Sequence, residues 1–546
     1  MTGRTDDFAD HPDLQRVGAR ERRQALALLW RAARPDRRQV VRATVWLAVA
    51  GLLEAAGPIF GKRLIDDYLL PRTFDATAVA LLIGGYLVTG WLATAIRYFE
   101  LVRLAGLAAR SVRRLRDAVY RHVLRLPMSY FDRAITGQLV SRITNDTEAV
   151  RELYTKVLFE LLVGLTVLFG VVVAMLWLDW RLMLIVLLLV PATIAIVVGY
   201  QRLSAAAVTR TRELRSDINA QMAEGIAGMS VLQAAGAVAR FSRRFARTND
   251  AQYAARMGEV RANAWLLRPA LDFATILLVV FIVTAVGTQR LGGVEVGLLF
   301  AFIAYIGRVV EPLIQITMQF SLLQQSVIAA ARVDALLQEG QAPAAGHARR
   351  IGAGRVELAA VTFGYDAAVP VLHDVALAIP AGSFVGVVGH TGSGKSTLLA
   401  LLLRFYVPQA GRIEIDGIPL AQIGDAHFRT DVGLVPQEPF LLAADARANI
   451  DMGRGLPDDA IVAAARAARA HGFIERLERG YATPLSEGGA RLSSGEKQLV
   501  AVARALAGRP RVLFLDEATS RIDSETEQRV AEALAELRGH TTVIAS

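Results

Sequence analysis

The sequence contains no cysteine, and aromatic side chains make up only 7% of its 546 residues. Without cysteine, the chain can form no disulfide, no thiolate metal site and no thiol redox centre. Its basic stretches also lack interleaved aromatic residues, which argues against a nucleic-acid partner. No secretory signal peptide is apparent, because the first long apolar run begins only at Val40, after a polar and arginine-rich start.

Apolar residues, by contrast, are abundant. They form 53% of the chain, and the mean hydropathy of +0.36 is typical of proteins with lipid-facing helices. The apolar excess ends near residue 325. The net charge of +10 is concentrated in arginine clusters beside apolar runs, which is the pattern of cytoplasmic loops. We therefore expect a membrane half followed by a soluble half.

Six apolar segments are long enough to cross a bilayer, at about 20 residues each. They lie near residues 40–61, 77–99, 158–178, 181–200, 266–287 and 296–320. Only Asp179 and Trp180 join the third segment to the fourth, whereas the links 100–154 and 201–265 are long, charged and helical in pattern. We expect those two links to extend the helices into the cytoplasm. Residues 14–35 are expected to form an amphipathic helix on the membrane surface.

Five ionisable residues lie within these segments: Glu54, Arg97, Asp272, Arg308 and Glu311. Such residues are candidates for a functional role. The alternative is that each forms a structural pair between helices, or lies near a span end and extends its side chain to the membrane–water interface. For any single one of the five, this alternative is favoured. Glu54 is the best functional candidate, because it lies well inside its segment.

The soluble half follows a stretch rich in alanine, glycine and proline, residues 338–354. Short apolar strands then alternate with helical stretches, which predicts an α/β domain. The expected divisions are a cytoplasmic tail (1–38), an all-α membrane domain of six helices (39–330), a linker (331–350) and an α/β domain (351–546).

A strand over residues 383–388 leads into Gly389–Ser396, and a helix follows. The pattern G-x-x-x-x-G-K-S in this context predicts a P-loop, whose backbone amides surround phosphate groups. Lys395 would reach the β- and γ-phosphates of a nucleotide, and the Ser396 hydroxyl would bind Mg²⁺. The expected phosphate contacts are Gly389, His390, Thr391, Gly392, Ser393, Gly394, Lys395, Ser396 and Thr397.

The second motif is acidic and follows the apolar strand over residues 512–515. Asp516 is suited to support a nucleotide-bound Mg²⁺. Glu517 is placed to act as a general base that polarises an attacking water. Between the two motifs, residues 491–498 read RLSSGEKQ and open a helix. They are either an ordinary N-cap or an anion site at the start of that helix.

Together, these motifs resemble the nucleotide-binding domain of ATP-binding-cassette (ABC) transporters over residues 351–546. The resemblance implies that Tyr365 stacks on adenine and that Gln437 contacts Mg²⁺ and faces the membrane domain. Leu492–Glu496 matches the family signature, usually LSGGQ, so that Ser493 and Gly495 would contact ATP bound by a second subunit. Ser520–Asp523 matches the loop after the catalytic glutamate.

The membrane half is similar to the exporter branch of the same family. Residues 126–150 resemble the first cytoplasmic coupling region of these exporters, and residues 224–241 resemble the second, less specifically. The resemblance implies a P-loop NTPase fused to a six-helix membrane domain, with ATP and Mg²⁺ as cofactors. It also implies a second half-transporter, because in this family two nucleotide-binding domains meet head to tail.

Three departures from the family pattern bear on the partner. Ser494 and Glu496 replace the usual glycine and glutamine of the signature, and Arg521 and Ile522 alter the loop after Glu517. The sequence also stops before the family histidine that contacts the γ-phosphate, so that it looks truncated at Ser546. We expect a heterodimer with unequal ATP sites, although a homodimer is possible.

The sequence therefore predicts one half of an ABC exporter in the inner or plasma membrane, with its N-terminus and α/β domain in the cytoplasm. It would hydrolyse ATP to export or flip hydrophobic or amphipathic compounds, such as a drug or a lipid. Two alternatives remain open: import of a metal chelate, and an ATP-gated regulator or channel of the same family. A soluble P-loop ATPase is contradicted by the six apolar segments.

Overall fold

The computed structural model describes residues 34–266, 268–288, 295–340, 350–366, 368–390, 392–489, 492–517 and 524–546, together with residues 23, 27 and 31. The chain divides into two compact units. The helical unit comprises Met1–Leu124 and Thr136–Glu339, and the α/β unit comprises Arg125–Ile135 and Gly340–Ser546. The expected surface helix over residues 14–35, Thr391 and the loop Ser520–Asp523 lie wholly or almost wholly outside the described residues.

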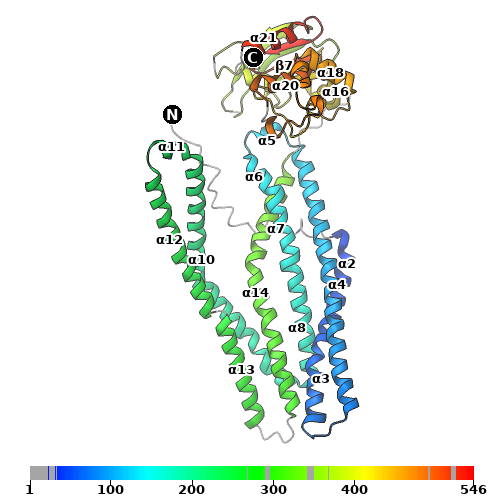
Figure 1. The fold of residues 1–546 in the computed structure, drawn as a ribbon, viewed down its shortest axis with the longest axis vertical. Helices are drawn as coiled ribbons and strands as arrows, with labels where there is room; N and C mark the ends of the chain where they lie inside the picture. The colour runs from blue at the N-terminus through cyan, green and yellow to red at the C-terminus, as the bar shows by residue number, and fades with distance from the viewer. Residues whose placement is uncertain are drawn as a thin grey trace. The chain divides into compact units, whose positions relative to one another are not determined.

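Within the described residues, six helices of the helical unit are long and apolar enough to cross a membrane, as the sequence predicted (Figure 1). The first two spans contain η2 (Arg34–Asp36), α2 (Arg37–Ala55), α3 (Gly57–Leu64), the π-helical turn η3 (Ile65–Leu69) and α4 (Ala76–Val123). The third and fourth contain α6 (Thr136–Ser141), η4 (Arg142–Asp146), α7 (Thr147–Glu152), η5 (Leu153–Leu158), α8 (Phe159–Leu178), α9 (Trp180–Leu187) and α10 (Leu189–Ala227). The short helix α11 (Met229–Ala234) lies between the fourth and fifth spans, and the last two spans contain α12 (Val238–Leu266), α13 (Arg268–Thr288) and α14 (Val296–Gln338).

Aspartate caps set where two of these spans begin. The side chain of Asp179 accepts hydrogen bonds from the backbone amides of Arg181 and Leu182, and Asp75 caps α4 in the same way. A carboxylate at this position satisfies amides that have no partner within the helix. Asp179 is the only residue between α8 and α9, so the predicted tight link between the third and fourth spans is confirmed.

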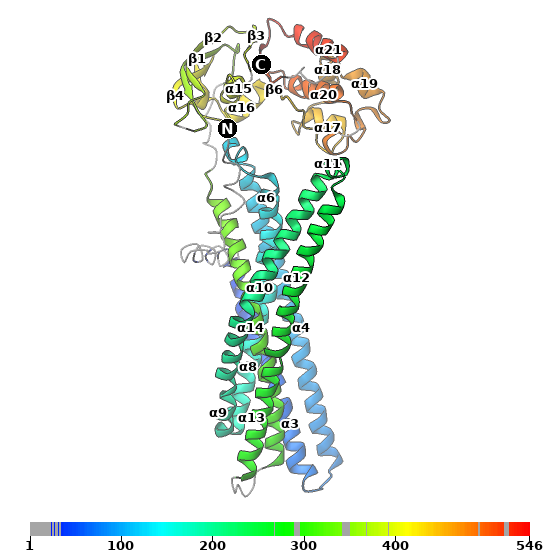
Figure 2. The same ribbon diagram turned by 90° about the vertical axis from the view of Figure 1, so that its left-hand side faces the viewer.

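Several helices are much longer than a bilayer requires. α4, α10 and α14 have 48, 39 and 43 residues, which is about 58–72 Å at 1.5 Å per residue. α10 and α12 run side by side to the turn at α11, as Figure 2 shows. α14 continues past residue 330 to Gln338, so that the first part of the expected linker is helical instead.

Glycines let the backbones of the first and third spans touch. A Cβ atom added to Gly51 of α2 would lie 2.5 Å from the carbonyl oxygen of Thr166 in α8. A Cβ atom added to Gly170 of α8 would lie 2.5 Å from the carbonyl oxygen of Gly51. Small residues at such crossings allow close van der Waals packing, which drives association of helices in lipid.

Within its described residues, the α/β unit forms two sheets. The first is antiparallel, in the order β2 (Leu372–Ile379), β1 (Val356–Phe363), β4 (Ala410–Ile415) and β5 (Ile418–Pro419). The second is parallel, in the order β3 (Phe384–Gly386), β8 (Thr542–Ala545), β7 (Val512–Leu515) and β6 (Val432–Val435). The helices are α5 (Met128–Phe131), α15 (Lys395–Leu402), α16 (Asp425–Asp431), α17 (Ala446–Asp451), α18 (Asp458–Ala467), α19 (His471–Glu475), α20 (Ser494–Ala507) and α21 (Ser524–Ala535). The predicted fold class is confirmed.

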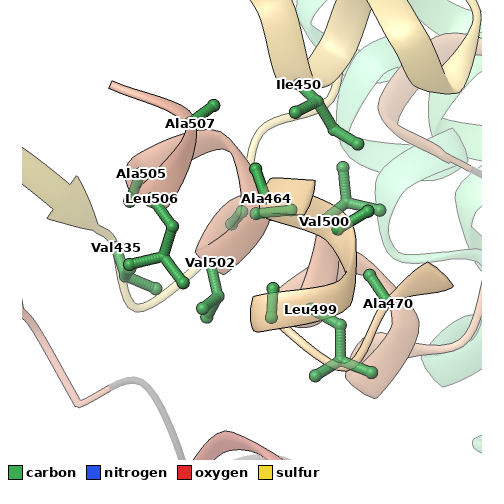
Figure 3. Close-up of a cluster of buried hydrophobic side chains, with 14 of the residues drawn as sticks. Val435, Ile450, Ala464, Ala470, Leu499, Val500, Val502, Ala505, Leu506 and Ala507 are labelled. Atoms are coloured by element: carbon green, nitrogen blue, oxygen red, sulfur yellow. The ribbon is translucent and has the colours of Figure 1, made fainter. Parts of the chain in front are cut away.

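Most residues of α20 are buried, from Gly495 and Gln498 through to Ala507. Figure 3 shows Leu499, Val500 and Val502 packed among side chains that include Ile450 of α17 and Ala464 of α18. A helix that is apolar on several sides is held within the core. The packing of α20 in this core therefore fixes the position of its first turn, which carries the RLSSGEKQ motif.

Candidate nucleotide-binding site

The predicted site residues follow neighbouring strands of the parallel sheet. The P-loop follows β3, Gln437 follows β6, and Asp516 follows β7. Ala545 of β8 lies opposite both Gly386 of β3 and Leu515 of β7. Because the carboxyl ends of parallel strands meet at one edge of a sheet, the loops that follow them surround a shared site.

Glycine backbone geometry shapes the P-loop. Gly392 and Gly394 have φ angles of +86° and +90°, which side chains rarely permit. A Cβ atom added to Gly394 would lie 2.9 Å from a methyl carbon of Leu372, whereas one added to Gly392 would meet nothing within 4 Å. A Cβ atom on Gly389 would lie 2.5 Å from the Ser393 hydroxyl oxygen. The loop is tightly packed on one side and has space at Gly392.

Lys395 lies over this loop at the start of α15. Its ammonium group donates hydrogen bonds to the carbonyl oxygens of Gly389, at 2.8 Å, and His390, at 3.2 Å. Ser396 and Thr397 follow in the first turn of the helix. A helix start with a glycine-rich loop before it offers free amides and the positive end of the helix dipole to an anion.

Tyr365 lies beside this first turn. Its hydroxyl oxygen is 3.3 Å from the Thr397 hydroxyl oxygen, and the residue is 51% exposed. Its ring packs edge-to-face on Phe363 and Tyr406, with centroids 5.4 and 5.1 Å apart. These rings hold Tyr365 in place while much of its surface remains open to a stacking partner.

The acidic motif is tied to the neighbouring strands. The Gln437 side-chain amide donates to a Glu517 carboxylate oxygen at 2.6 Å, and the Ser546 hydroxyl donates to Asp516 at 2.9 Å. Glu517 has a φ of +41°, which is uncommon for a residue with a side chain. Such strained backbone often occurs at functional sites. The structure thus brings Gln437 and Glu517 into direct contact.

The RLSSGEKQ motif forms a capping box at the start of α20. The Ser493 hydroxyl accepts from the Glu496 amide at 3.2 Å, and the Glu496 carboxylate accepts from the Ser493 amide at 2.9 Å. The same carboxylate also accepts from the Ser493 hydroxyl at 3.1 Å. Among the described residues, no hydrogen bond joins Ser493 to the P-loop. Within one chain, the motif is therefore an N-cap.

A tyrosine that the sequence analysis missed links the predicted first coupling region to the predicted nucleotide site. The Tyr406 hydroxyl donates a hydrogen bond to Asp132, which directly follows α5. Burial and this hydrogen bond raise the pKa of Tyr406 above its usual range, so that the hydroxyl keeps its proton. Tyr406 in turn packs on Tyr365. A contact chain therefore runs from Asp132 to the predicted adenine-stacking residue.

Most of the ionisable residues within the spans form pairs. Arg97 of α4 forms an ion pair with Glu54 of α2. Arg268 of α13 lies 3.6 Å from Glu311 of α14 and 3.9 Å from Asp272. These contacts favour the structural alternative for all three carboxylates, including Glu54, the best functional candidate from the sequence.

Comparison with known proteins identifies both halves of the chain. Residues 40–313 match the family model for the ABC transporter transmembrane region, and residues 372–520 match the model for the ABC transporter. The chain belongs to the ABC transporter family. ATP hydrolysis coupled to transport is the shared activity of this family, so the protein is a multi-pass membrane ATPase.

The relatives of this ABC transporter carry names that refer to different compounds. It is 32% identical over 512 residues to the multidrug resistance-like ATP-binding protein MdlB of Buchnera aphidicola, covering 94% of this chain and 88% of that protein. It is 31% identical over 542 residues to the ATP-dependent lipid A-core flippase of Syntrophus aciditrophicus, covering 97% and 88%. It is 36% identical over 497 residues to the fatty acid ABC transporter ATP-binding/permease protein of Mycobacterium tuberculosis, covering 90% and 77%.

A solved structure with a similar fold is that of a bacterial Atm1-family ABC exporter with ATP bound. The TM-score is 0.76 at 27% sequence identity, and the match covers 93% of this chain and 91% of that chain. The match spans both units of this transporter, so the exporter fold that the sequence predicted is confirmed.

Arg504 supports α20, the helix that begins at the signature, and was not predicted from the sequence. Arg504 of α20 donates to the carbonyl oxygens of Asn449 and Phe440, both at 2.8 Å. Burial lowers the pKa of Arg504, and Asn449 is itself fully buried. The signal in the sequence was an arginine within the otherwise apolar run LVAVARALA. Arg504 ties α20 to the segment that follows Gln437.

Proposed function

We propose that this chain is one half of a dimeric ABC exporter that moves hydrophobic or amphipathic compounds across the membrane by alternating access. The convergence of the P-loop, Gln437, Asp516 and Glu517 at one edge of the parallel sheet carries the proposal. It is supported by relatives named for multidrug resistance, lipid A-core flipping and fatty acid transport. No observation favours the importer or the ATP-gated regulator.

Each site residue then has a defined role in ATP hydrolysis. Lys395 binds the β- and γ-phosphates once its ammonium leaves the carbonyl oxygens of the loop, and Tyr365 stacks on adenine. Glu517 accepts a proton from the attacking water. The amides of the P-loop hold the phosphates; of the predicted contacts there, only Thr391 lies outside the described residues.

The oxygen donors at this edge fit Mg²⁺. Ser396, Gln437 and Asp516 supply a hydroxyl, an amide carbonyl and a carboxylate, which are the hard ligands that this cation prefers. The Gln437 amide nitrogen already donates to Glu517, so its carbonyl oxygen is the atom free to face the cation. Bound Mg²⁺ would neutralise charge on the β- and γ-phosphates.

The partner proposal rests on the signature. Ser493 and Gly495 would contact ATP held by the P-loop of a second subunit, and the Glu496 carboxylate lies at the amide and hydroxyl that would make that contact. A carboxylate at this place disfavours a triphosphate. We therefore favour a heterodimer in which this chain's P-loop and Glu517 form the more active site.

The membrane orientation is also part of the proposal. We place the chain in the inner or plasma membrane, with the α/β unit and the N-terminus in the cytoplasm. The arginine-rich links beside the long helical extensions support this orientation.

Purified transporter, alone and with any partner that copurifies, tests the catalytic assignment. Glu517→Gln should lower the rate of ATP hydrolysis at this chain's site by at least about a hundredfold. Glu475→Gln, an equal charge change elsewhere in the α/β unit, should leave it unchanged. Near-normal turnover in Glu517→Gln would remove Glu517 from its role. Uptake by inside-out vesicles, compared with whole cells, distinguishes export from import.

A further inference from the structure

A cavity of 280 Å³ lies in the helical unit between α3, α4 and α14. Three aromatic rings form much of its wall, and each packs on a glycine. A Cβ atom on Gly57 would lie 3.2 Å from the Tyr86 ring, and one on Gly61 would lie 2.5 Å from the Phe300 ring. The ring of Phe60 packs on Gly85 in the same way. The walls are therefore apolar.

One cation enters this apolar cavity. Arg308 of α14 lines it, and one of its guanidinium nitrogens donates to the backbone carbonyl oxygen of Glu54 at 2.5 Å. Arg308 follows the start of α14 at Val296 by about 18 Å at 1.5 Å per residue. This depth is near the middle of a hydrocarbon layer of about 30 Å, where an unpaired charge is costly.

The carboxylates of Glu54, whose backbone oxygen accepts from Arg308, and of Glu311 are engaged by other arginines. Glu54 pairs with Arg97, and Glu311, one turn along α14 from Arg308, lies 3.6 Å from Arg268. Within the described residues, Arg308 itself forms no ion pair. Its guanidinium has five N–H donors in a planar fork that matches a carboxylate or a phosphate. The cavity thus combines apolar walls with one positive charge that no side chain among the described residues neutralises.

We propose that this cavity binds an amphipathic anion, with Arg308 as the counter-ion of its carboxylate or phosphate headgroup and the rings of Phe60 and Phe300 against its alkyl chain. The inference rests on the proposed export function and narrows its substrate class. A cationic drug is disfavoured at this place, because the guanidinium would repel it.

Photolabelling of the full transporter tests the site. The protein, with any copurifying partner, is reconstituted in nanodiscs of zwitterionic lipid and labelled with a diazirine derivative of palmitate. Mass spectrometry should map the label to α3, α4 and α14, including Leu82 and Ala304, which line the cavity. Oleate, oleoyl-lysophosphatidate and oleyl alcohol are then used as competitors.

The headgroup charge should decide the competition. In Arg308→Gln, the concentration of oleate needed for half-competition should rise at least about tenfold, whereas that of oleyl alcohol should not change. Arg308→Lys should stay within about threefold of the native protein. Arg181→Gln, which removes an arginine from the start of α9 away from the cavity, is the matched control.

A filled cavity gives a second variant that keeps the charge. Ala304→Phe should weaken competition by oleate and by oleyl alcohol alike, and its elution in size-exclusion chromatography reports whether it folds. If oleate alone competes, the ligand is a free fatty acid. If the lysophosphatidate alone competes, the ligand is a phospholipid. If both compete, the site accepts either headgroup.

The proposal is overturned if the label lies outside the cavity, if neither anion competes, or if the anion that competes in the native protein competes equally in Arg308→Gln. It is also overturned if oleyl alcohol competes as well as that anion in the native protein. The export function is judged separately, by the effect of Glu517→Gln on ATP hydrolysis. If hydrolysis depends on Glu517 but no anion is bound, the cavity proposal alone fails.

Discussion

At the level of single residues, the proposed asymmetry of the two ATP sites rests on Ser493 and Glu496 of the signature. Glu496 accepts hydrogen bonds from the amide and the hydroxyl of Ser493. Either glutamate or glutamine can complete a capping box, so the helix start does not require the negative charge. The charge therefore affects an anion brought to Ser493 more than it affects the fold.

Glu496→Gln should strengthen nucleotide binding at the site that this signature faces. Loss of one carboxylate charge near a triphosphate at an exposed site should raise affinity about threefold to fivefold. Trapping of labelled ATP in the assembled transporter measures this. Glu478→Gln, an exposed glutamate of the same unit, should change nothing. Equal trapping in the native protein and Glu496→Gln would argue against unequal sites.

Local spacing accounts for the site residues that the sequence could predict. The P-loop and Asp516–Glu517 follow strands within a few residues, and strand order places them at one sheet edge. Tyr406 and Asp132 are 274 residues apart, and no local pattern links them. The Glu54–Arg97 pair likewise depends on how α2 and α4 pack. Contacts set by packing are therefore what the sequence analysis missed.

At the level of elements, Tyr406 connects the predicted first coupling region to the predicted nucleotide site. Tyr406→Phe removes the hydrogen bond to Asp132 but keeps the ring that packs on Tyr365. Loss of about 1 kcal/mol should reduce transport per ATP severalfold while ATP hydrolysis remains near normal. Transport and hydrolysis are measured in the same proteoliposomes. Tyr481→Phe, which removes a hydroxyl 3.0 Å from His471, is the control.

The crossing of α2 and α8 should tolerate no side chain at Gly51. Gly51→Ala would place a methyl group 2.5 Å from the Thr166 carbonyl oxygen. Separation of the two helices should destabilise the helical unit by about 1–3 kcal/mol, seen as a lower midpoint of thermal aggregation in detergent. Gly90→Ala, whose Cβ atom would meet nothing within 4 Å, should not lower that midpoint. Equal midpoints for both variants would contradict the close crossing.

For the whole molecule, the absence of cysteine allows a direct test of orientation. Thr73, before α4, and Ala235, before α12, are both exposed. In the proposed orientation, Thr73→Cys should react with a membrane-impermeant maleimide in intact cells. Ala235→Cys should react only after the membrane is permeabilised. The reverse pattern would contradict the proposed orientation, and the native protein is the unlabelled control.

The six spans were predictable because runs of about 20 apolar residues have few other uses. The end of α14 was not. Composition changes near residue 325, yet the helix continues to Gln338 because Ala329, Ala330 and Val333 are buried within the helical unit. A hydropathy average does not show which residues are buried by tertiary packing, so it could not predict where α14 ends.

Because α14 is long, a small bend within it would move its far end by several ångströms. Pro312 lies inside this helix, and proline removes a backbone hydrogen bond there, which makes it a natural pivot. From Pro312 to Gln338 the helix measures about 39 Å at 1.5 Å per residue. A tilt of about 5° at the pivot would therefore swing Gln338 sideways by roughly 3 Å. Arg308 lies one turn before Pro312 and lines the cavity, so a change in the bend at Pro312 would also shift the far end of α14 relative to the cavity.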